Sequence, residues 1–330
     1  MPRKLLVFSV LALVALCAAP VVRAQEVLSR NLFDVAQKRY QENDSPEAKL
    51  AKKLHLRVKS AILMNMNTGE ILFEQDPDRQ IPPASLTKIL TLYIIFNEIQ
   101  NGGLRPWEEV PVSMNADNTF GSTMSLKAGE EVTVTEIIKG ISIASANDGC
   151  VAMAEYLEKG DVNAFVRRMN DTAKSLGMEH TTFCNPNGLP AEGQLTTARD
   201  LLTLAQTYLT RFPKALAIHS QKYYSHNNRT RHNANSLLGK YEGVDGLKTG
   251  YVTAAGYNIA ATAKRGDARL LAVVLGARNA AVREAETARL LDTGFEIIEA
   301  QRETRERLAT ATVPPQVLAS TLQESPSLAN

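Results

Sequence analysis

Residues 85–99 read SLTKILTLYIIFNEI, and this stretch sets the expectation for the fold. It is apolar on nearly every side from Leu86 to Ile99, which predicts a helix buried in the middle of a domain. Two prolines precede the stretch and an Asn-Gly-Gly sequence follows it, as expected for the start and the end of a helix. Lys88 is therefore expected in an apolar environment, unusual for a lysine.

Ser85 and Lys88 are three residues apart, so a helix places them on one face and within reach of each other. The hydroxyl would lie in the first turn, where free backbone N–H groups and the helix dipole favour a developing negative charge. Burial lowers the pKa of a lysine, and a neutral amine accepts a serine proton. The pair is typical of an activated serine, although a helix-start serine followed by a solvated lysine is the simpler alternative.

A second segment, Ser145-Ala-Asn147, follows a capping-box candidate, Thr133-x-x-Glu136, and a predicted helical run from Val134 to Ile143. The surrounding residues 144–149 predict a turn. An ordinary loop between helices would explain this composition equally well. The segment indicates a functional site only in combination with the other two segments.

The third segment, Lys248-Thr-Gly250, ends a glycine-flanked run that begins at Gly243 and leads into alternating apolar residues, as an edge strand would. A solvated lysine at a turn is the alternative. Any one of the three segments is a weak signal. The ordered set S-x-x-K, S-x-N and K-T-G predicts a serine acyl-transfer site, since such a site needs a nucleophile, a base, a proton route and an oxyanion cradle.

The chain resembles the serine-type D-alanyl-D-alanine carboxypeptidases, the low-molecular-weight penicillin-binding proteins of cell-wall metabolism. The resemblance extends over about residues 58 to 299. Beyond the three segments it is carried by residues 60–73, the approach Ile81-Pro-Pro-Ala-Ser85, and the stretches 126–130, 185–190, 197–200 and 255–258.

The resemblance implies that Ser85 is acylated by the penultimate D-alanine of a peptidoglycan stem peptide and that water then frees the enzyme. It implies Lys88 as the general base, with Ser145 and Lys248 passing a proton to the leaving amine. The oxyanion hole would be formed by the N–H groups of Ser85 and Tyr251. Penicillins would act as pseudo-substrates, because a β-lactam resembles the D-Ala-D-Ala unit.

The substrate-binding residues that the resemblance implies are Asn147, Lys248, Thr249, Gly250 and Tyr251. Asn147 would hold the peptide or Lys88, while Thr249 and Lys248 would meet the terminal carboxylate.

The chain departs from the common pattern two residues after the K-T-G glycine, where many relatives carry a hydroxyl and this chain has Val252. Some relatives also bring an arginine from the segment before the third motif. Arg229 and Arg231 lie in that region, although a solvated basic loop is the simpler interpretation.

Three other functions stay open. A D,D-endopeptidase of the same fold would cleave peptidoglycan crosslinks. A β-lactamase would deacylate rapidly with an added glutamate between the second and third motifs, but Glu192 lacks the usual following asparagine. A non-catalytic wall-binding protein would keep the fold without turnover.

The expected architecture is an α/β (α+β) fold of the β-lactamase and transpeptidase type. An antiparallel five-stranded sheet is flanked by helices, and residues 86–240 form a mainly helical lobe. The site would lie between the sheet edge and the lobe. Expected elements are strands at Lys59–Met66, Ile71–Gln75, Asn258–Lys264 and Arg269–Leu275 and a last helix at Ala280–Ala300.

The ends of the chain are expected to lie outside this domain. Arg3 and Lys4, an apolar run and Val22-Arg-Ala24 predict a secretory signal peptide over residues 1–24. Residues 25–57 predict a helical lead, 58–300 the D,D-peptidase domain and 301–330 a disordered tail without a C-terminal membrane anchor. The expected location is the periplasm, in soluble form after signal-peptide cleavage.

Removal of residues 1–24 deletes three basic residues, which changes 37 basic and 35 acidic residues to 34 and 35. A nearly neutral chain gives no support for nucleic-acid binding. The five histidines lack the paired spacing of a zinc site, so neither a metal nor another cofactor is expected. Cys150 and Cys184 are left as a disulfide, as free thiols or as small buried residues.

Overall fold

The computed structural model describes residues 46–311. These belong to two units, and the first contributes one described helix, α2 (Pro46–Lys53), within the predicted helical lead. The second unit starts at Leu54 and contains the sheet and the remaining helices. The predicted signal segment lies outside the described residues.

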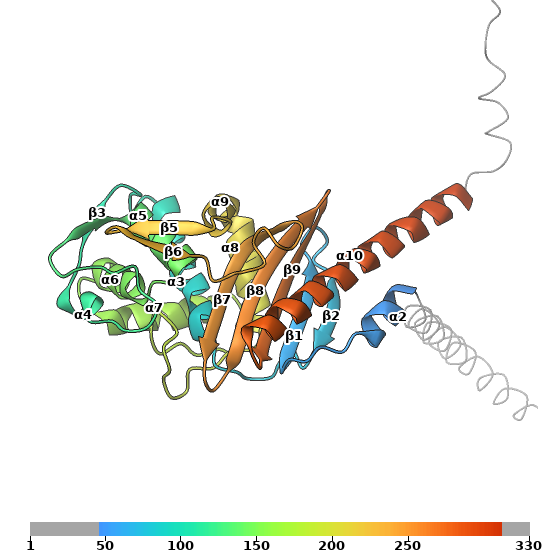
Figure 1. The fold of residues 1–330 in the computed structure, drawn as a ribbon, viewed down its shortest axis with the longest axis horizontal. Helices are drawn as coiled ribbons and strands as arrows, with labels where there is room; N and C mark the ends of the chain where they lie inside the picture. The colour runs from blue at the N-terminus through green and yellow to red at the C-terminus, as the bar shows by residue number, and fades with distance from the viewer. Residues whose placement is uncertain (1–45, 312–330) are drawn as a thin grey trace, which may run out of the picture. The chain divides into compact units, whose positions relative to one another are not determined.

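Five antiparallel strands form the main sheet in the order β2-β1-β9-β8-β7, with β2 and β7 at its edges (Figure 1). The strands are β1 (Ser60–Asn65), β2 (Ile71–Gln75), β7 (Val244–Val252), β8 (Gly256–Arg265) and β9 (Ala268–Ala277). The predicted five-stranded antiparallel sheet is confirmed. The third motif was expected to precede its strand, but Lys248, Thr249 and Gly250 lie inside β7.

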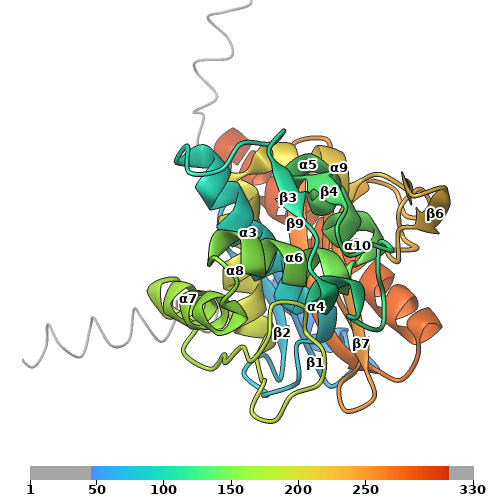
Figure 2. The ribbon, with the colours of Figure 1, turned by 90° about the vertical axis from the view of Figure 1, so that its left-hand side faces the viewer.

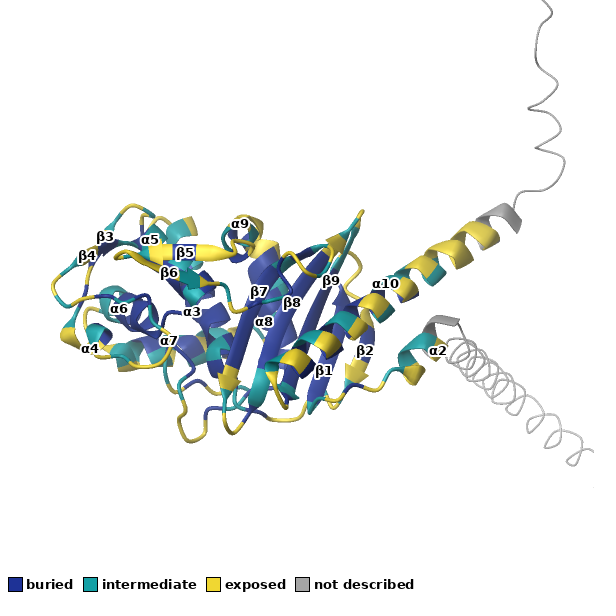
Figure 3. Cartoon of the chain, in the orientation of Figure 1, coloured by how far each residue is buried: buried dark blue, intermediate teal, exposed yellow. Residues whose placement is uncertain are grey.

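Helices cover both faces of this sheet. The helix α10 (Ala280–Ala311) packs on one face, and α8 (Ala198–Arg211) packs on the opposite face (Figures 1 and 2). Strands β8 and β9 are therefore buried on both sides, which explains their almost continuous apolar sequences. Figure 3 shows the central part of both strands in dark blue, the colour of buried residues.

The last helix is longer than predicted. It was expected to end at Ala300 and to be followed by a disordered tail, but α10 continues to Ala311. Ion pairs one turn apart join Arg302 to Glu299 and Glu306, and Arg307 to Glu303. Such pairs stabilise a helix without an apolar face. Residues 312–330 lie outside the described part of the chain.

A mainly helical lobe lies beyond the β7 edge (Figure 1). It contains η1 (Ala84–Thr87), α3 (Lys88–Gln100), α4 (Met114–Asp117), α5 (Val134–Lys139), the π-helical turn η2 (Gly140–Ala144), α6 (Asn147–Leu157) and α7 (Val162–Ser175). Two small two-stranded sheets belong to this side, β3 (Glu109–Pro111) with β4 (Glu131–Thr133) and the hairpin of β5 (Tyr223–His226) with β6 (Arg229–His232). The turn η3 (Pro213–Ala215) and α9 (Leu216–His219) connect α8 to β5.

The helix α3 is the centre of the lobe. Its residues from Lys88 to Ile95 are all buried, which agrees with the absence of a polar face in its sequence. Thr133 caps α5 by accepting a hydrogen bond from the Glu136 N–H at 3.3 Å, as the capping-box sequence predicts.

Candidate active site

Ser85 lies in the short 3₁₀ turn η1 directly before α3, and not in the first turn of an α-helix as predicted. The turn starts at Ala84, whose φ of 50° is in the left-handed region. Lys88 is the first residue of α3 and is completely buried, whereas Ser85 is partly exposed. The nucleophile candidate is thus accessible while its neighbour is enclosed.

The Lys88 Nζ atom lies 2.9 Å from Ser85 Oγ and 2.7 Å from Asn147 Oδ1, and it also donates to the Asn187 carbonyl oxygen. Burial lowers the pKa of Lys88 to about 8. A neutral amine has two N–H groups and one lone pair. Because two fixed acceptors, the Asn147 and Asn187 oxygens, can take both N–H groups, the lone pair is directed at the Ser85 hydroxyl.

Asn147 is held in the orientation that this arrangement needs. Its Nδ2 donates to the Phe120 carbonyl at 2.8 Å, which leaves Oδ1 for Lys88, and its backbone N–H donates to Ser122 O at 2.7 Å. The predicted turn at residues 144–149 is shorter than expected, because α6 starts at Asn147. Asn147 is therefore fixed by a helix start.

Lys248 and Ser145 form a second buried lysine–serine pair. Lys248 Nζ donates to Ser145 Oγ at 2.9 Å and to Thr249 O at 3.0 Å. Burial first, and the charge of Lys88 second, lower the pKa of Lys248 well below its usual value. Ser145 has a φ of 59°, at the end of the π-helical turn η2. Single π-helical turns inside or next to α-helices are frequent at functional sites.

Gly250 allows β7 to approach the serine turn closely. A Cβ atom at this position would lie 2.9 Å from the Ser85 backbone nitrogen, which real side chains do not tolerate. Thr249 is buried, while Tyr251, on the other side of Gly250, is 52% exposed, with its ring centroid 4.4 Å from that of Tyr257. The third segment is thus in direct contact with the first.

The structure brings the three predicted segments together. Arg229 and Arg231 contact the Ser125 hydroxyl at 3.4 and 3.1 Å. Val252 lines a cavity of about 250 Å³ beside the serine turn. Cys150 and Cys184 are free, and Cys150 is buried with its pKa raised to about 12 by burial.

Three residues near the site were not assigned a role from sequence. Asn187 supplies a carbonyl to Lys88. Asn258 Nδ2 donates to Pro82 O at 3.2 Å and, more weakly, to Pro83 O at 3.4 Å, so β8 supports the serine turn. Arg283 is 5% exposed and its charge also lowers the pKa of Lys248. The two asparagines lie in stretches that carry the sequence resemblance, 185–190 and 255–258, whereas Arg283 lies in none of the stretches quoted for it.

Asn187 is presented by tight packing of its loop on α3 and η1. Thr91 Oγ1 donates to Pro186 O at 2.6 Å. A Cβ atom on Gly188 would lie 1.9 Å from Ala84 O, so only glycine permits this approach.

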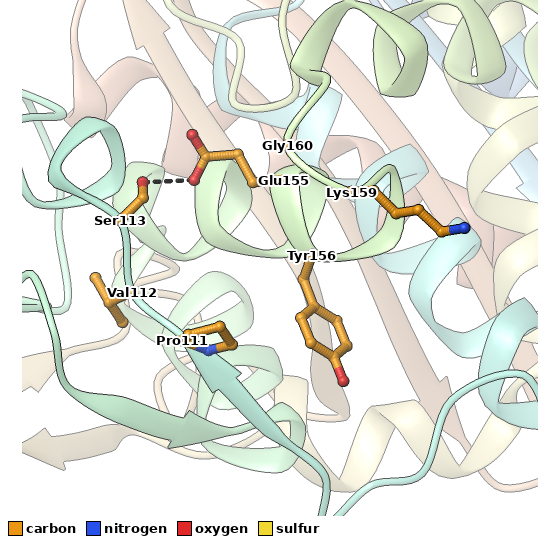
Figure 4. Close-up of a pocket in the computed structure, with 7 residues that line it drawn as sticks. All are labelled: Pro111, Val112, Ser113, Glu155, Tyr156, Lys159 and Gly160. Atoms are coloured by element: carbon orange, nitrogen blue, oxygen red, sulfur yellow. Dashed lines mark hydrogen bonds between the residues drawn. The ribbon is translucent and has the colours of Figure 1, made fainter.

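A larger cavity, of about 420 Å³, lies between β3 and the end of α6 and lacks comparable chemistry (Figure 4). Its one carboxylate, Glu155, already accepts hydrogen bonds from Ser113 and Asn115. Tyr156 and Lys159 point away from that carboxylate in Figure 4. Its serine hydroxyl, Ser113 Oγ, donates to a carboxylate, and the cavity lining contains no counterpart of the buried Lys88 amine beside Ser85.

The D-alanyl-D-alanine carboxypeptidase family, peptidase S11, matches residues 47–279 of the chain. The chain belongs to this family. It is 38% identical over 253 residues to the D-alanyl-D-alanine carboxypeptidase DacF of Bacillus subtilis, and the match covers 76% of this chain and 65% of that protein. The chain thus spans less than two thirds of the length of this curated relative.

Solved structures of the family share the fold. Penicillin-binding protein 6B of Escherichia coli is 37% identical with a TM-score of 0.70, over 73% of this chain and 78% of that one. Penicillin-binding protein D2 of Listeria monocytogenes in its cefotaxime-bound form is 31% identical with a TM-score of 0.67, over 74% and 99% of the two chains. The penicillin-binding fold predicted from sequence is confirmed.

Proposed function

We propose that the protein is a penicillin-sensitive serine D-Ala-D-Ala carboxypeptidase that removes the terminal D-alanine from peptidoglycan stem peptides. The observation that carries the proposal is the Lys88 amine, buried and directed at the Ser85 hydroxyl by two carbonyl acceptors. Family membership supports the substrate class, because the matched relatives are named for this reaction.

In the first half of the reaction, Lys88 accepts the Ser85 proton and Ser85 Oγ bonds to the carbonyl carbon of the penultimate D-alanine. The oxyanion would be met by the Ser85 and Tyr251 N–H groups, at the contact that Gly250 permits. Ser145 gives a proton to the leaving amine as the C–N bond breaks, and Lys248 gives a proton to Ser145 to replace it. Water then hydrolyses the ester and releases the shortened stem.

The terminal carboxylate of the substrate needs hydrogen-bond donors and nearby positive charge. Lys248 and Arg283 are both buried, and the charge of Arg283, which is also paired with Glu284 at 3.4 Å, acts on Lys248. Thr249 is buried beside Lys248. These residues support a carboxylate site here, so the absence of a hydroxyl at Val252 does not remove the means of recognition.

The test is to incubate the purified protein with a fluorescent penicillin, measure the intact mass, and assay D-alanine release from a stem pentapeptide. The proposal expects a stable adduct on Ser85 together with D-alanine release. In a Ser85→Ala variant both signals should disappear, because the nucleophile is gone. Labelling that persists in this variant would reject Ser85 as the nucleophile, and rapid penicillin loss without an adduct would indicate a β-lactamase.

We further propose that the protein acts in the periplasm, where its substrate is found. The predicted signal segment supports this location, although it lies outside the described residues. No helix in the described range 46–311 is long and apolar enough to span a membrane.

A further inference from the structure

Asp148 follows Asn147 in the first turn of α6, and its carboxylate is buried, because only 1% of the residue is exposed. One carboxylate oxygen accepts hydrogen bonds from the backbone N–H groups of Met124 at 3.0 Å and Gly149 at 2.9 Å. The other oxygen accepts from the Leu126 N–H at 3.0 Å. All three donors are neutral, so they fix the carboxylate without cancelling its negative charge.

Two of these bonds hold the segment 120–126 against the helical lobe. The side chain of Met124 adds to this attachment, since it packs on two glycines that leave room for it. A Cβ atom on Gly140, in η2, would lie 2.4 Å from the Met124 sulfur, and one on Gly149, in α6, would lie 3.3 Å from it. The segment is therefore attached to the lobe by the Asp148 carboxylate and by one buried side chain.

The same segment orients Asn147. The Phe120 carbonyl accepts a hydrogen bond from Asn147 Nδ2 at 2.8 Å, and the Ser122 carbonyl accepts one from the Asn147 N–H at 2.7 Å. Asn147 Oδ1 is thereby left for Lys88 Nζ at 2.7 Å. A shift of the segment would turn the asparagine and withdraw one of the two acceptors that direct the lone pair of Lys88.

The charge of Asp148 acts on the same amine. Burial lowers the pKa of Lys88 to about 8, and Cys150 and Asp148 act in the opposite direction. Cys150 is a neutral thiol near pH 7, because burial raises its pKa to about 12. Of these two neighbours on α6, it is therefore Asp148 that favours the protonated form of the amine.

Two further titratable groups face this pair from other elements. Lys248, on β7, acts mutually with Lys88, since burial and then the charge of Lys88 lower the pKa of Lys248. Tyr224, on β5, faces Asp148 with an uncharged phenol, because burial raises the pKa of Tyr224. Neither group supplies a negative charge that could replace that of Asp148.

We propose that Asp148 is a positioning residue for the Lys88 base and acts through the segment 120–126 and Asn147. This rests on the proposed function and adds to it a residue that takes no part in bond making or breaking. The hydrogen bonds of the carboxylate fix the asparagine, which determines the maximal rate of acylation. Its charge determines the pH at which that rate is reached.

The test is the second-order rate of acylation by a fluorescent penicillin, measured from about pH 6 to 9. In Asp148→Asn, the pH of half-maximal rate should fall by about one unit, because a buried negative charge near Lys88 is removed. The maximal rate should fall about tenfold, because an amide cannot accept all three N–H groups and Asn147 is held less firmly.

Asp200→Asn is the matched control for loss of a buried carboxylate. Asp200 is 5% exposed and accepts hydrogen bonds from the His180 N–H at 2.9 Å and the Thr181 hydroxyl at 2.6 Å. Its replacement should lower the melting temperature as the replacement of Asp148 does. The pH of half-maximal rate and the maximal rate of the folded protein should both stay unchanged.

Gly121→Ala tests the segment while the carboxylate stays in place, and it remains informative if Asp148→Asn does not fold. Gly121 is exposed and has a φ of 88°, and its Cβ atom would lie 2.8 Å from Asn147 Nδ2. The maximal rate should fall about tenfold with no shift in the pH of half-maximal rate. The control is Gly129→Ala, which has a similar φ of 85° and no atom within 4 Å of the added Cβ. It should leave both quantities unchanged.

The proposal is overturned if folded Asp148→Asn keeps the pH of half-maximal rate of the unaltered protein, or if Asp200→Asn shows the same shift. It is also overturned if Gly121→Ala is acylated as fast as Gly129→Ala. An unaltered protein that does not react with penicillin at all would instead reject the proposed function.

Discussion

Lys88 is the residue whose charge matters most for the proposed chemistry. Its amine is fully buried, and burial moves its pKa from 10.5 to about 8. Near neutral pH an ordinary lysine is almost entirely protonated and cannot accept a proton. The depressed pKa gives a usable fraction of neutral amine, and the carbonyls of Asn147 and Asn187 fix the direction of its lone pair.

The pKa of Lys88 predicts the pH dependence of acylation. Only the neutral amine acts as a base, so the second-order rate of penicillin acylation should rise with pH and level off above about 8. Stopped-flow or gel-based labelling between pH 6 and 9 measures this. A rate that stays flat over that range would contradict Lys88 as the titrating base.

Lys88→Arg provides the companion experiment, because a guanidinium stays protonated at every accessible pH. We expect acylation to fall by about 10²-fold or more, within the usual range for loss of a general base. Circular dichroism and thermal unfolding should accompany the assay, since the larger side chain enters a fully buried position. A folded Lys88→Arg protein with near-normal labelling would remove Lys88 from this role.

Among the elements, the contact between η1 and β7 determines the geometry of the site. The strand contributes Gly250, whose missing side chain allows the Ser85 backbone to approach. From the other side, the loop at Gly188 packs on Ala84 and presents Asn187. The serine turn is thus enclosed between an edge strand and a loop.

Gly250→Ala should reduce acylation by about 10²-fold, because the added methyl group displaces the serine turn from β7 by a fraction of an ångström or more. Gly294→Ala is a suitable control. Gly294 lies on α10, and a Cβ atom at this position would be 2.5 Å from Leu63 Cδ2 in strand β1. The control should lower the melting temperature while the folded protein keeps its acylation rate. Equal acylation by the two variants would contradict the role of Gly250.

Asn258 is the link between the sheet and the serine turn. It is fully buried, donates to two proline carbonyls, and accepts from the Gly276 N–H at 2.9 Å. Asn258→Ala leaves these groups unpaired and should cost about 2–3 kcal/mol in the free energy of unfolding. Acylation of the folded fraction should fall as well, because η1 loses its support.

Asn67→Ala is the matched control for Asn258→Ala. Asn67 also bridges backbone groups, at Asp267 and Arg269, but it is exposed at the β1–β2 turn. Its replacement should cost clearly less stability and leave acylation unchanged. Urea unfolding and penicillin labelling measure both effects. If the two variants behave alike, Asn258 has no positioning role.

In the molecule as a whole, the unit that begins at Leu54 carries both the sheet and the candidate site. The buried part of α10 belongs to this unit, since Leu290, Leu291 and Ile297 are at most 2% exposed. From Arg302 to Arg307 the helix is exposed throughout. The functional part of the chain is therefore expected to end near residue 301.

A protein consisting of residues 54–301 should keep its melting temperature within a few degrees and react with penicillin as before. A shorter protein, residues 54–291, loses buried Ile297 and partly buried Phe295 and should melt about 10 °C lower or fail to fold. Calorimetry and fluorescent labelling test both. Loss of folding in the 54–301 protein would show that the end segments contribute to the stability of this unit.

The amino-acid sequence by itself determined the family, the five-stranded antiparallel sheet, the buried character of α3 and the candidates Ser85, Lys88, Ser145 and Lys248. These follow from local order and hydrophobic pattern, which the sequence displays directly. It did not show the 3₁₀ turn at Ser85, the early start of α6, or the helical extension to Ala311. The first two depend on packing against β7 and the 120–122 segment, and the third on pairs of charges one turn apart.

Only the tertiary structure decided which groups meet Lys88. The Asn187 carbonyl is 99 positions away in the sequence and the Asn147 oxygen 59 positions away, and a backbone carbonyl has no signature in the identity of its residue. The depressed pKa values of Lys88 and Lys248 likewise result from burial by residues distant in the chain. The sequence identifies the chemical groups of such a site, but their orientation and their protonation state depend on how the folded chain packs around them.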